Sequence, residues 1–258
     1  NNDFVLHYQP IIDADSGKVV SVEALIRWNH PVNGLIPPDE FIPVAETTGF
    51  IVPLGEWVIK EACRQKHLWT QLGVNSFSVA INLAANQFAS DKLVRLLNRT
   101  LARYNLNTDS ISLEITESTL MEDTEDLGVR INKLHEMGYS FSLDDFGTGY
   151  SSLAYLKRFP VDKIKIDRSM IVDVPENKEN SAICEAIISI GKAFGIKVIA
   201  EGVETENQLK YFREIGCHQI QGYLISRPLE AGDLAQWVRQ REFNLFPAHV
   251  DSRLDLSL

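Results

Sequence analysis

Apolar and polar residues follow two different periods along this chain. In eight short runs apolar residues tend to fill alternate positions, which is the period of a β-strand. In longer stretches they recur every three or four positions, as on one face of an α-helix. The predicted strands are Phe4–Ile12, Val19–Trp28, Phe77–Leu83, Ile111–Thr116, Ser140–Asp144, Lys163–Asp167, Lys197–Glu201 and Gln219–Gly222. The predicted helices are Glu56–Leu72, Asp91–Tyr104, Glu125–Met137, Ala182–Phe194 and Glu206–Ile215.

The order of these elements predicts the fold class. Strands that alternate with helices through short connections form a parallel sheet covered by helices. Eight strands in about 240 residues fit a closed (β/α)₈ TIM-like barrel better than an open doubly wound sheet. The first two strands are separated only by Asp13–Lys18, which is the length of a hairpin and too short for a parallel crossover. We therefore expect an α/β barrel whose first strand is antiparallel.

Polar residues near the ends of the predicted strands indicate a functional site. Side chains alternate between the two faces of a strand, and the second face of a helix-covered parallel sheet lines the barrel interior. Active sites of such barrels lie at the carboxyl ends of the strands. One acid at a strand end is usually a helix cap, but seven strands carry polar groups there. These residues are Glu23, Asn82, Glu114, Asp144, Lys165, Asp167, Glu201 and Gln221.

The chemistry of this set favours a divalent metal. Carboxylates brought together repel one another unless cations or protons intervene, and oxygen ligands suit Mg²⁺ or Mn²⁺ rather than zinc. Two such ions are typical of phosphodiester hydrolysis, and Lys165 is placed to orient the attacking water. A Mg²⁺-dependent enolising barrel is the competing interpretation, because Lys163-Ile164-Lys165 resembles its lysine pair. That enzyme would require a separate capping domain, so the residues favour the phosphodiesterase.

A glycine-containing segment offers a different interpretation. Gly147-Thr148-Gly149-Tyr150-Ser151-Ser152 follows a predicted strand, and Asp167 lies twenty residues after Gly147, as in a dinucleotide-binding fingerprint. The third glycine is missing, however, and Asp144-Asp145 would repel a pyrophosphate. We expect instead a loop over the end of the barrel.

Composition narrows the function classes further. The chain has 258 residues with 35 acids and 25 bases, a net charge of −10 that argues against binding of a nucleic acid polymer. Three cysteines form no CxxC pair, and no apolar segment is long enough to insert into a membrane. We expect one domain over residues 1–246, a tail without clear structure over 247–258, and a cytoplasmic location. Because the chain starts without methionine, we also expect it to be a domain of a longer protein, with a membrane anchor elsewhere as one option.

At these positions the sequence resembles the EAL-domain family, the cyclic di-GMP phosphodiesterases of bacterial signalling. The resemblance covers about residues 4–243 and consists of ordered blocks. They are EALIRW from Glu23, HPVNGLIPPDEFIPVAE from His30, INLAANQF from Ile81, LEITES from Leu113, DDFGTGYSSL from Asp144, KIKID from Lys163, AEGVET from Ala200 and QGYLISRPL from Gln221.

The resemblance implies roles for individual residues. Glu23, Asn82, Glu114 and Asp144 are similar to ligands of a first metal, Asp145 to a ligand of a second, and Asp167 to a residue at the metal waters. Glu201 resembles the general base and Lys165 the lysine that positions the water, with Glu23 also counted as catalytic. The resemblance implies that Gln9, Arg27, Gln221 and Asp167 contact substrate or water. Glu117 resembles the acid that anchors the loop Asp144–Leu153, and Glu204 has a supporting role there.

The resemblance also implies a reaction and partners. We expect hydrolysis of cyclic di-GMP to linear pGpG with two Mg²⁺ or Mn²⁺ ions, inhibition by Ca²⁺, and a homodimer. Other domains of the same longer chain, cyclase-like or sensory, are expected as partners. The alternative is a degenerate module that binds cyclic di-GMP without cleaving it. Every ligand position is intact here, which favours the enzyme, and the acids of the site account for most of the negative net charge.

Overall fold

The computed structural model describes residues 3–89, 91–121, 125–147 and 153–245. The predicted tail, residues 247–258, therefore lies outside the described residues. The same holds for residues 148–152 of the glycine-containing loop, so neither expectation is tested. Among the described residues, no helix combines the length and the apolar character that a membrane span requires.

The strands of the described residues close into a barrel. Eight of them follow one another around it in the order β1-β9-β8-β7-β6-β5-β4-β2, and β1 pairs with β2 to complete the ring. β1 is antiparallel to both of its neighbours, and all other barrel pairs are parallel. The predicted barrel with its antiparallel first strand is thus confirmed. The strands are β1 (Phe4–Asp13), β2 (Val19–His30), β4 (Ser78–Asn82), β5 (Ile111–Thr116), β6 (Ser140–Phe146), β7 (Lys163–Ile166), β8 (Lys197–Ala200) and β9 (Gln219–Gln221).

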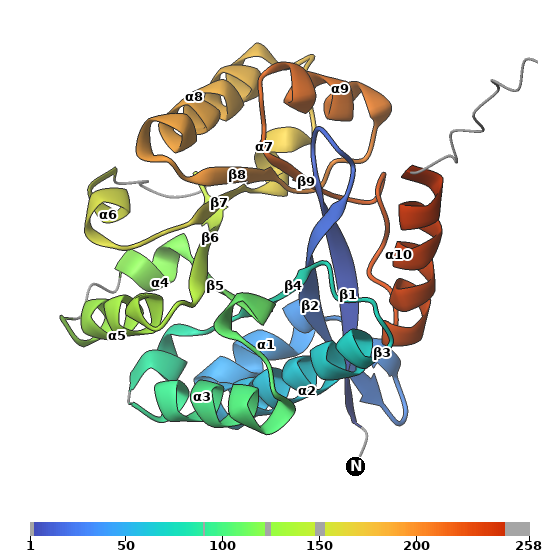
Figure 1. Ribbon diagram of the computed structural model, residues 1–258. Helices are drawn as coiled ribbons and strands as arrows, with labels where there is room; N and C mark the ends of the chain where they lie inside the picture. Colours follow the sequence, from blue (N-terminus) through green and yellow to red (C-terminus); the bar gives the residue numbers. More distant parts are fainter. Residues whose placement is uncertain (1–2, 90, 122–124, 148–152, 246–258) are drawn as a thin grey trace, which may run out of the picture.

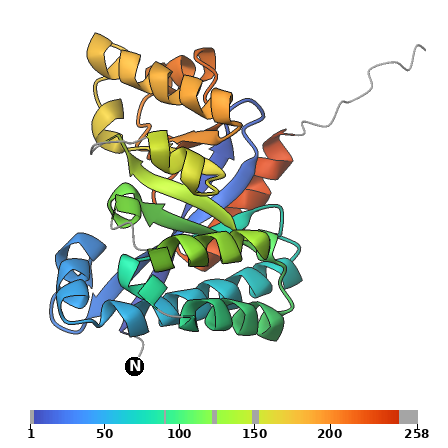
Figure 2. The same cartoon turned by 90° about the vertical axis from the view of Figure 1, so that its left-hand side faces the viewer.

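Helices surround the strands (Figure 1). The α-helices are α1 (Pro38–Thr47), α2 (Ile51–Gln71), α3 (Lys92–Tyr104), α4 (Glu117–Met121), α5 (Glu125–Glu136), α6 (Leu153–Arg158), α7 (Arg168–Ile171), α8 (Lys178–Phe194), α9 (Glu206–Glu214) and α10 (Ala231–Leu245). Two short 3₁₀ helices, η1 (Ala85–Ala89) and η2 (Thr108–Ser110), precede α3 and β5. A short strand, β3 (Gly34–Ile36), pairs with the end of β2. Figure 2 shows α1 standing apart from the ring of helices, on the side away from the β1–β2 turn.

The sequence prediction missed several of these elements. It found α2, α3, α5, α8 and α9, but not α1, α4, α6, α7, α10 or β3. Three of the missed helices have only four to six residues, too few for an apolar period to repeat. The start of α1 contains Pro37 and Pro38 and its interior contains Pro43, which read as loop signals in a sequence. Glycines that follow the last apolar turn of a predicted helix do end the helices: Gly195, for example, ends α8 with φ +70°.

The alternation within the strands separates an apolar outer layer from a polar interior. Ile111, Leu113 and Ile115 of β5 are buried on the side of the helices. Ser112 of the same strand lies 3.5 Å from the Ser142 hydroxyl of β6, across the interior face. Small hydroxyl side chains therefore fill the barrel beneath its carboxyl end, where larger polar groups gather.

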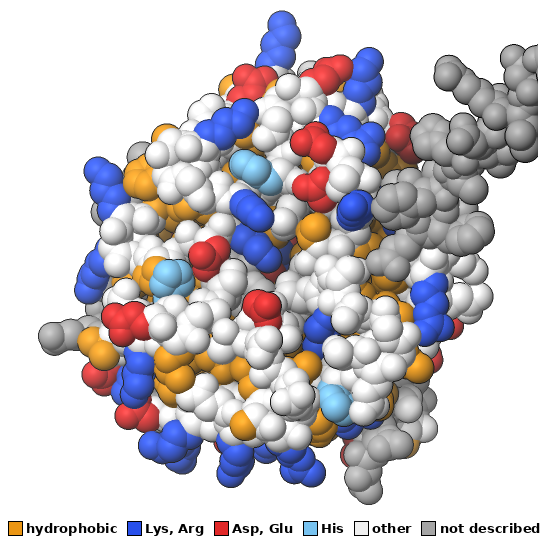
Figure 3. All heavy atoms as spheres, in the orientation of Figure 1, with side chains coloured by type: hydrophobic (Ala, Val, Ile, Leu, Met, Phe, Trp, Pro, Cys, Tyr) orange, Lys and Arg blue, Asp and Glu red, His pale blue; other side chains and the backbone are white. Residues whose placement is uncertain are grey.

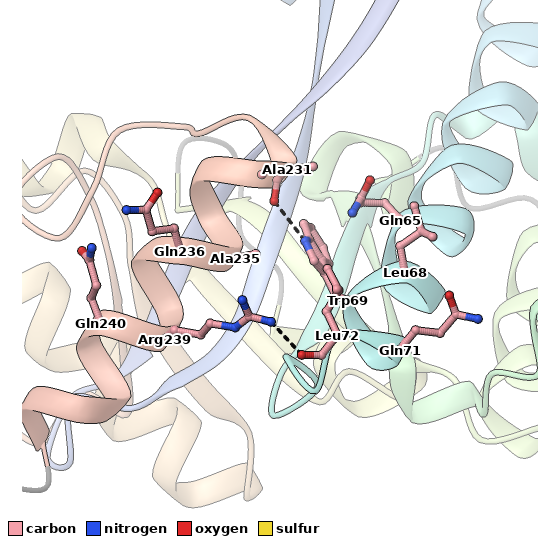
Figure 4. Close-up of a pocket in the computed structure, with 11 residues that line it drawn as sticks. Gln65, Leu68, Trp69, Gln71, Leu72, Ala231, Ala235, Gln236, Arg239 and Gln240 are labelled. Carbon is pink, nitrogen blue, oxygen red and sulfur yellow. Dashed lines mark hydrogen bonds between the residues drawn. The ribbon is translucent and has the colours of Figure 1, made fainter.

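A cavity of about 660 Å³ lies between α2 and α10 (Figure 4). At its base the Trp69 indole donates a hydrogen bond to the Ala231 carbonyl at 3.0 Å, and Arg239 donates one to the Leu72 carbonyl at 2.7 Å. Of the described residues that line it, only Arg239 is charged. None of the described residues that line this groove is a carboxylate, so the metal-binding groups that the sequence predicts are not among them and the candidate site lies elsewhere.

Candidate active site

Lys165 of β7 occupies the centre of a cluster of four carboxylates. Its Nζ lies 2.6 Å from Glu201 Oε1, 2.8 Å from Glu114 Oε2, 3.2 Å from Asp144 Oδ2 and 3.4 Å from Glu23 Oε2. The four acids come from or follow β2, β5, β6 and β8, and Lys165 itself is 1% exposed. The barrel thus brings together residues that are far apart in sequence but equally late in their strands.

Neutral amides complete one side of this cluster. Asn82 of β4 donates to Glu23 Oε1 at 2.8 Å, and Gln221 of β9 donates to Glu23 Oε2 at 2.7 Å. The same Gln221 amide lies 3.2 Å from Gln9 Oε1 of β1, and Gln9 in turn donates to the Ser226 carbonyl at 3.1 Å. These amides fix the orientation of the Glu23 carboxylate.

The charges of the cluster do not balance. Four carboxylates against one ammonium leave a formal charge of −3. Burial, with the neighbouring carboxylates Glu23 and Asp144, raises the pKa of Glu114 to about 8. Burial and the same neighbours also raise the pKa of Glu201 well above its ordinary value. Burial alone would lower the pKa of Lys165, but the surrounding carboxylates raise it well above 10.5.

This excess of negative charge fits a divalent cation. One carboxylate oxygen each from Glu23, Glu114 and Asp144 lie within 4.8 Å of one another. Glu114 Oε1 is buried and has no hydrogen-bond partner among the described residues, which is costly for a carboxylate unless an ion or water contacts it. Oxygen donors of this kind match the preference of Mg²⁺ and Mn²⁺. The residues present therefore suit the metal that the sequence analysis predicted.

Asp145 and Asp167 lie beside this cluster rather than in it. Asp145 has φ +55°, and the pairing of β6 with β7 is irregular between Leu143 and Phe146. This turn of the backbone explains how adjacent aspartates avoid pointing to opposite faces of the strand. Burial and the charges of Asp144 and Asp167 raise the pKa of Asp145. Asp167 itself precedes α7 and accepts a hydrogen bond from the Ser169 amide at 2.9 Å.

Three other predicted residues lie outside the cluster. Arg27, half-buried near the end of β2, donates to the Ile26 carbonyl at 2.8 Å. Glu117 at the start of α4 accepts a hydrogen bond from the Gly147 amide at 3.1 Å, so it touches the first part of the predicted loop. Glu204 forms an ion pair of 2.8 Å with Arg168.

Arg168 and Tyr223 are residues of this region that the sequence analysis did not identify. Both line a cavity of about 190 Å³ that also contacts Lys165 and Glu201. Their position directly after Asp167 and two residues after Gln221 was the available signal. A second cavity of about 640 Å³ reaches the cluster at Glu114, is also lined by the neighbouring Asn82 and Asp145, and extends between β2, α1 and α2. The two cavities flank the carboxylates and leave room for a ligand much larger than a metal ion.

Comparisons with known proteins agree with this architecture. A family model described as the EAL domain matches residues 1–228. The chain is 47% identical over 230 residues to the bifunctional diguanylate cyclase/cyclic di-GMP phosphodiesterase MucR of Pseudomonas aeruginosa. The aligned region covers 89% of this chain and 34% of MucR. It is 40% identical over 240 residues to the cyclic di-GMP phosphodiesterase PdeR of Escherichia coli. That alignment covers 93% of this chain and 36% of PdeR. The chain thus spans about a third of the length of these curated relatives.

Solved structures show the same relationship. The PaMucR phosphodiesterase in complex with c-di-GMP superposes with a TM-score of 0.86 at 46% identity, over 90% of this chain and 94% of that one. The EAL enzyme Bd1971, in a form with cAMP and cyclic di-GMP bound, has a TM-score of 0.88 at 32% identity. That match covers 92% of this chain and 65% of the Bd1971 chain. The family match over most of the sequence and the shared barrel lead to one conclusion: this chain belongs to the EAL domain family.

Proposed function

We propose that this chain hydrolyses cyclic di-GMP to linear pGpG. The observation that carries the proposal is the cluster of Glu23, Glu114, Asp144 and Glu201 around Lys165 at the carboxyl end of the barrel. Relatives with 40–47% identity are named cyclic di-GMP phosphodiesterases, and a similar structure is a c-di-GMP complex. Both the retained acids and the named relatives support a hydrolase over a binding module.

Divalent cations, which we propose to be Mg²⁺ or Mn²⁺, would be held by these side chains. Glu23, Asn82, Glu114 and Asp144 are the proposed ligands of one ion and Asp145 is a proposed ligand of a second. Asp167 completes the proposed metal site near the metal-bound waters. Bound there, the ions would supply Lewis acidity toward a phosphate oxygen and a more acidic water. Two divalent charges would also offset the −3 of the cluster, which favours approach of an anionic substrate.

The remaining polar residues are proposed to act on water and substrate. Lys165, held among acids, orients the attacking water and stabilises charge that develops on the phosphate. Glu201, 2.6 Å from Lys165, accepts the proton of that water. Gln9, Gln221 and Arg27 contact a phosphate or the water. The cavity of about 640 Å³ beside the cluster is large enough for a nucleoside portion.

Glu117 and Glu204 are proposed to support the site indirectly. Glu117 holds the Gly147 amide and thereby the beginning of the loop that follows Asp145. Glu204 holds Arg168, which adjoins Asp167. We also propose that the chain works as a homodimer. We propose further that it is part of a longer protein, since the named relatives are about three times its length.

Chromatography of a reaction with cyclic di-GMP and Mg²⁺ tests this function. We expect pGpG to form with wild-type protein and to be absent with Glu201→Gln, because that carboxamide cannot accept the proton. The variant should keep the circular dichroism spectrum and cyclic di-GMP affinity of the wild type. If the wild type binds cyclic di-GMP tightly but forms no pGpG in either Mg²⁺ or Mn²⁺, the phosphodiesterase is excluded and the chain is a binding module.

Replacing Mg²⁺ by Ca²⁺ tests the role of the metal. Ca²⁺ accepts more ligands at longer distances than Mg²⁺ does, so it should permit cyclic di-GMP binding while suppressing cleavage. Titration calorimetry for binding and chromatography for cleavage separate the two effects. Full activity in Ca²⁺ would contradict the proposal that cleavage requires Mg²⁺ or Mn²⁺.

A further inference from the structure

Another polar cavity lies on the face of the barrel opposite the carboxylate cluster. Figure 3 views this face, which carries the β1–β2 turn and the amino ends of the parallel strands. A cavity of about 500 Å³ lies there between the start of β4, the end of α2 and the segment that joins α3 to β5. Most of its lining residues carry hydroxyl or amide groups: Thr70, Asn75, Ser76, Ser78, Asn105, Asn107 and Ser110.

Lys66 of α2 lines this cavity and is 3% exposed. Its ammonium donates to the carbonyl oxygens of Asn75, at 3.2 Å, and Phe77. An ammonium has three N–H donors, so one is left for another acceptor. Within the described part of the chain, no carboxylate forms an ion pair with it. The Lys66 nitrogen also lies 4.8 Å from the centre of the Phe77 ring. Lys66 is therefore a buried cation that no carboxylate of the described residues contacts directly, which is a costly arrangement in a folded protein.

Further hydrogen-bond donors line the same cavity. Asn75, Asn105 and Asn107 are exposed, and their side-chain amides make no hydrogen bond to the described residues. Asn107 precedes η2 without capping it through its side chain, so its amide is available to a ligand. Asp109 is the one acid in the lining, but it is exposed, and water screens its charge more than that of buried Lys66.

We propose that this cavity binds a small oxyanion, a phosphate or carboxylate group, through Lys66 and the neighbouring asparagine amides. The bound anion would accept the remaining N–H of the ammonium and supply a counter-charge in direct contact with it. Burial lowers the pKa of Lys66 to about 8, and the charge of Asp109 offsets this lowering only in part. The site is separate from the proposed phosphodiesterase chemistry and does not depend on it.

Thermal unfolding in the presence of inorganic phosphate tests the proposal. Phosphate should raise the melting temperature of wild-type protein above the effect of sodium chloride at equal ionic strength. Lys66→Met should weaken the phosphate affinity by at least about tenfold, because the ion loses its charged partner. Asp109→Asn should strengthen it, because a like charge is removed from the lining. Acetate in place of phosphate shows whether a single carboxylate suffices.

Lys60→Met is the matched control. Lys60 lies on the same helix, but it is exposed and pairs with Glu56 at 3.2 Å, outside the cavity. Phosphate that binds at the carboxylate end of the barrel contributes equally in all variants, so only differences between them report on this site. Equal phosphate responses in wild type and Lys66→Met would overturn the proposal. Should Lys66→Met fail to fold, an Asp109→Asn response no larger than that of wild type would overturn it instead.

Discussion

Lys165 is the residue on which the acids of the candidate active site converge. A single ammonium contacts carboxylates from four other parts of the chain, and burial makes each of these interactions stronger than it would be in water. Removal of one partner from a buried charge network leaves the others uncompensated. Lys165 therefore matters for stability as well as for the proposed reaction.

Lys165→Met should lower turnover by at least about 100-fold, because the group that orients the water is lost. Without divalent metal the variant should also melt at a lower temperature than wild type, since the carboxylates then repel one another. Lys163→Met is the control, because Lys163 lies on the same strand, two residues earlier, and makes none of these ion pairs. A Lys165→Met enzyme with near-normal turnover would exclude the assigned role.

Lys66 should make the free energy of unfolding depend on pH. Burial lowers its pKa from 10.5 to about 8, so between these values the unfolded chain binds more protons than the folded one. The free energy of unfolding should therefore rise as pH increases from about 8 to 10.5. Urea unfolding in phosphate-free buffer, compared with Lys66→Met, isolates this contribution. An identical pH dependence in the two proteins would contradict it.

At the scale of elements, the segment after β8 is held by close backbone contacts. Val203 donates to the Gln221 carbonyl at 3.1 Å, and Leu224 donates to the Val203 carbonyl at 3.1 Å. A Cβ on Gly222 would collide with the Val203 backbone, which cannot swing away as a flexible side chain could. The positions of Glu201 and Gln221 therefore depend on a glycine that carries no chemistry itself.

Gly222→Ala should destabilise the protein by at least about 2 kcal/mol through this overpacking. It should also reduce turnover, because Gln221 and Glu201 flank the displaced segment. Gly232→Ala is the matched control, because a Cβ at this position would meet nothing within 4 Å. The stability of this variant should equal or slightly exceed that of the wild type. Chemical unfolding and the pGpG assay measure both effects. Wild-type stability in Gly222→Ala would mean that the segment shifts freely.

For the whole molecule, the negative net charge is concentrated where it can be used. The chain carries a net charge of −10, and a cluster with a formal charge of −3 lies at one end of the barrel. Folding has to bring these acids together against their repulsion. Divalent ions that bind only the folded state should therefore stabilise it.

Mg²⁺ at about 100 times its dissociation constant should raise the melting temperature by about 5 °C or more. Sodium chloride at the same ionic strength should not reproduce this rise, and EDTA should reverse it. Glu23→Ala should lose most of the effect, because it removes one of the three oxygens that lie within 4.8 Å of one another. An equal rise in Glu23→Ala would place the stabilising ion elsewhere.

The sequence by itself determined the barrel, its antiparallel first strand and the residues that gather at its carboxyl end. Strand and helix periods, the short Asp13–Lys18 connection and alternation within each strand are local properties, so they can be recognised without coordinates. Short helices such as α4 and α7 were not predicted, because they are shorter than two turns and show no repeating apolar period.

Only the tertiary structure decided which of those residues touch. Glu114 and Lys165 are 51 positions apart, and Gln221 and Glu23 are 198 apart, so no local pattern links them. Asp145 has a positive φ of +55°, which the sequence alone does not indicate for an aspartate. Lys66 looks like an ordinary helix surface residue, and only the packing of α2 against the start of β4 buries its charge. These contacts depend on how the whole chain closes upon itself.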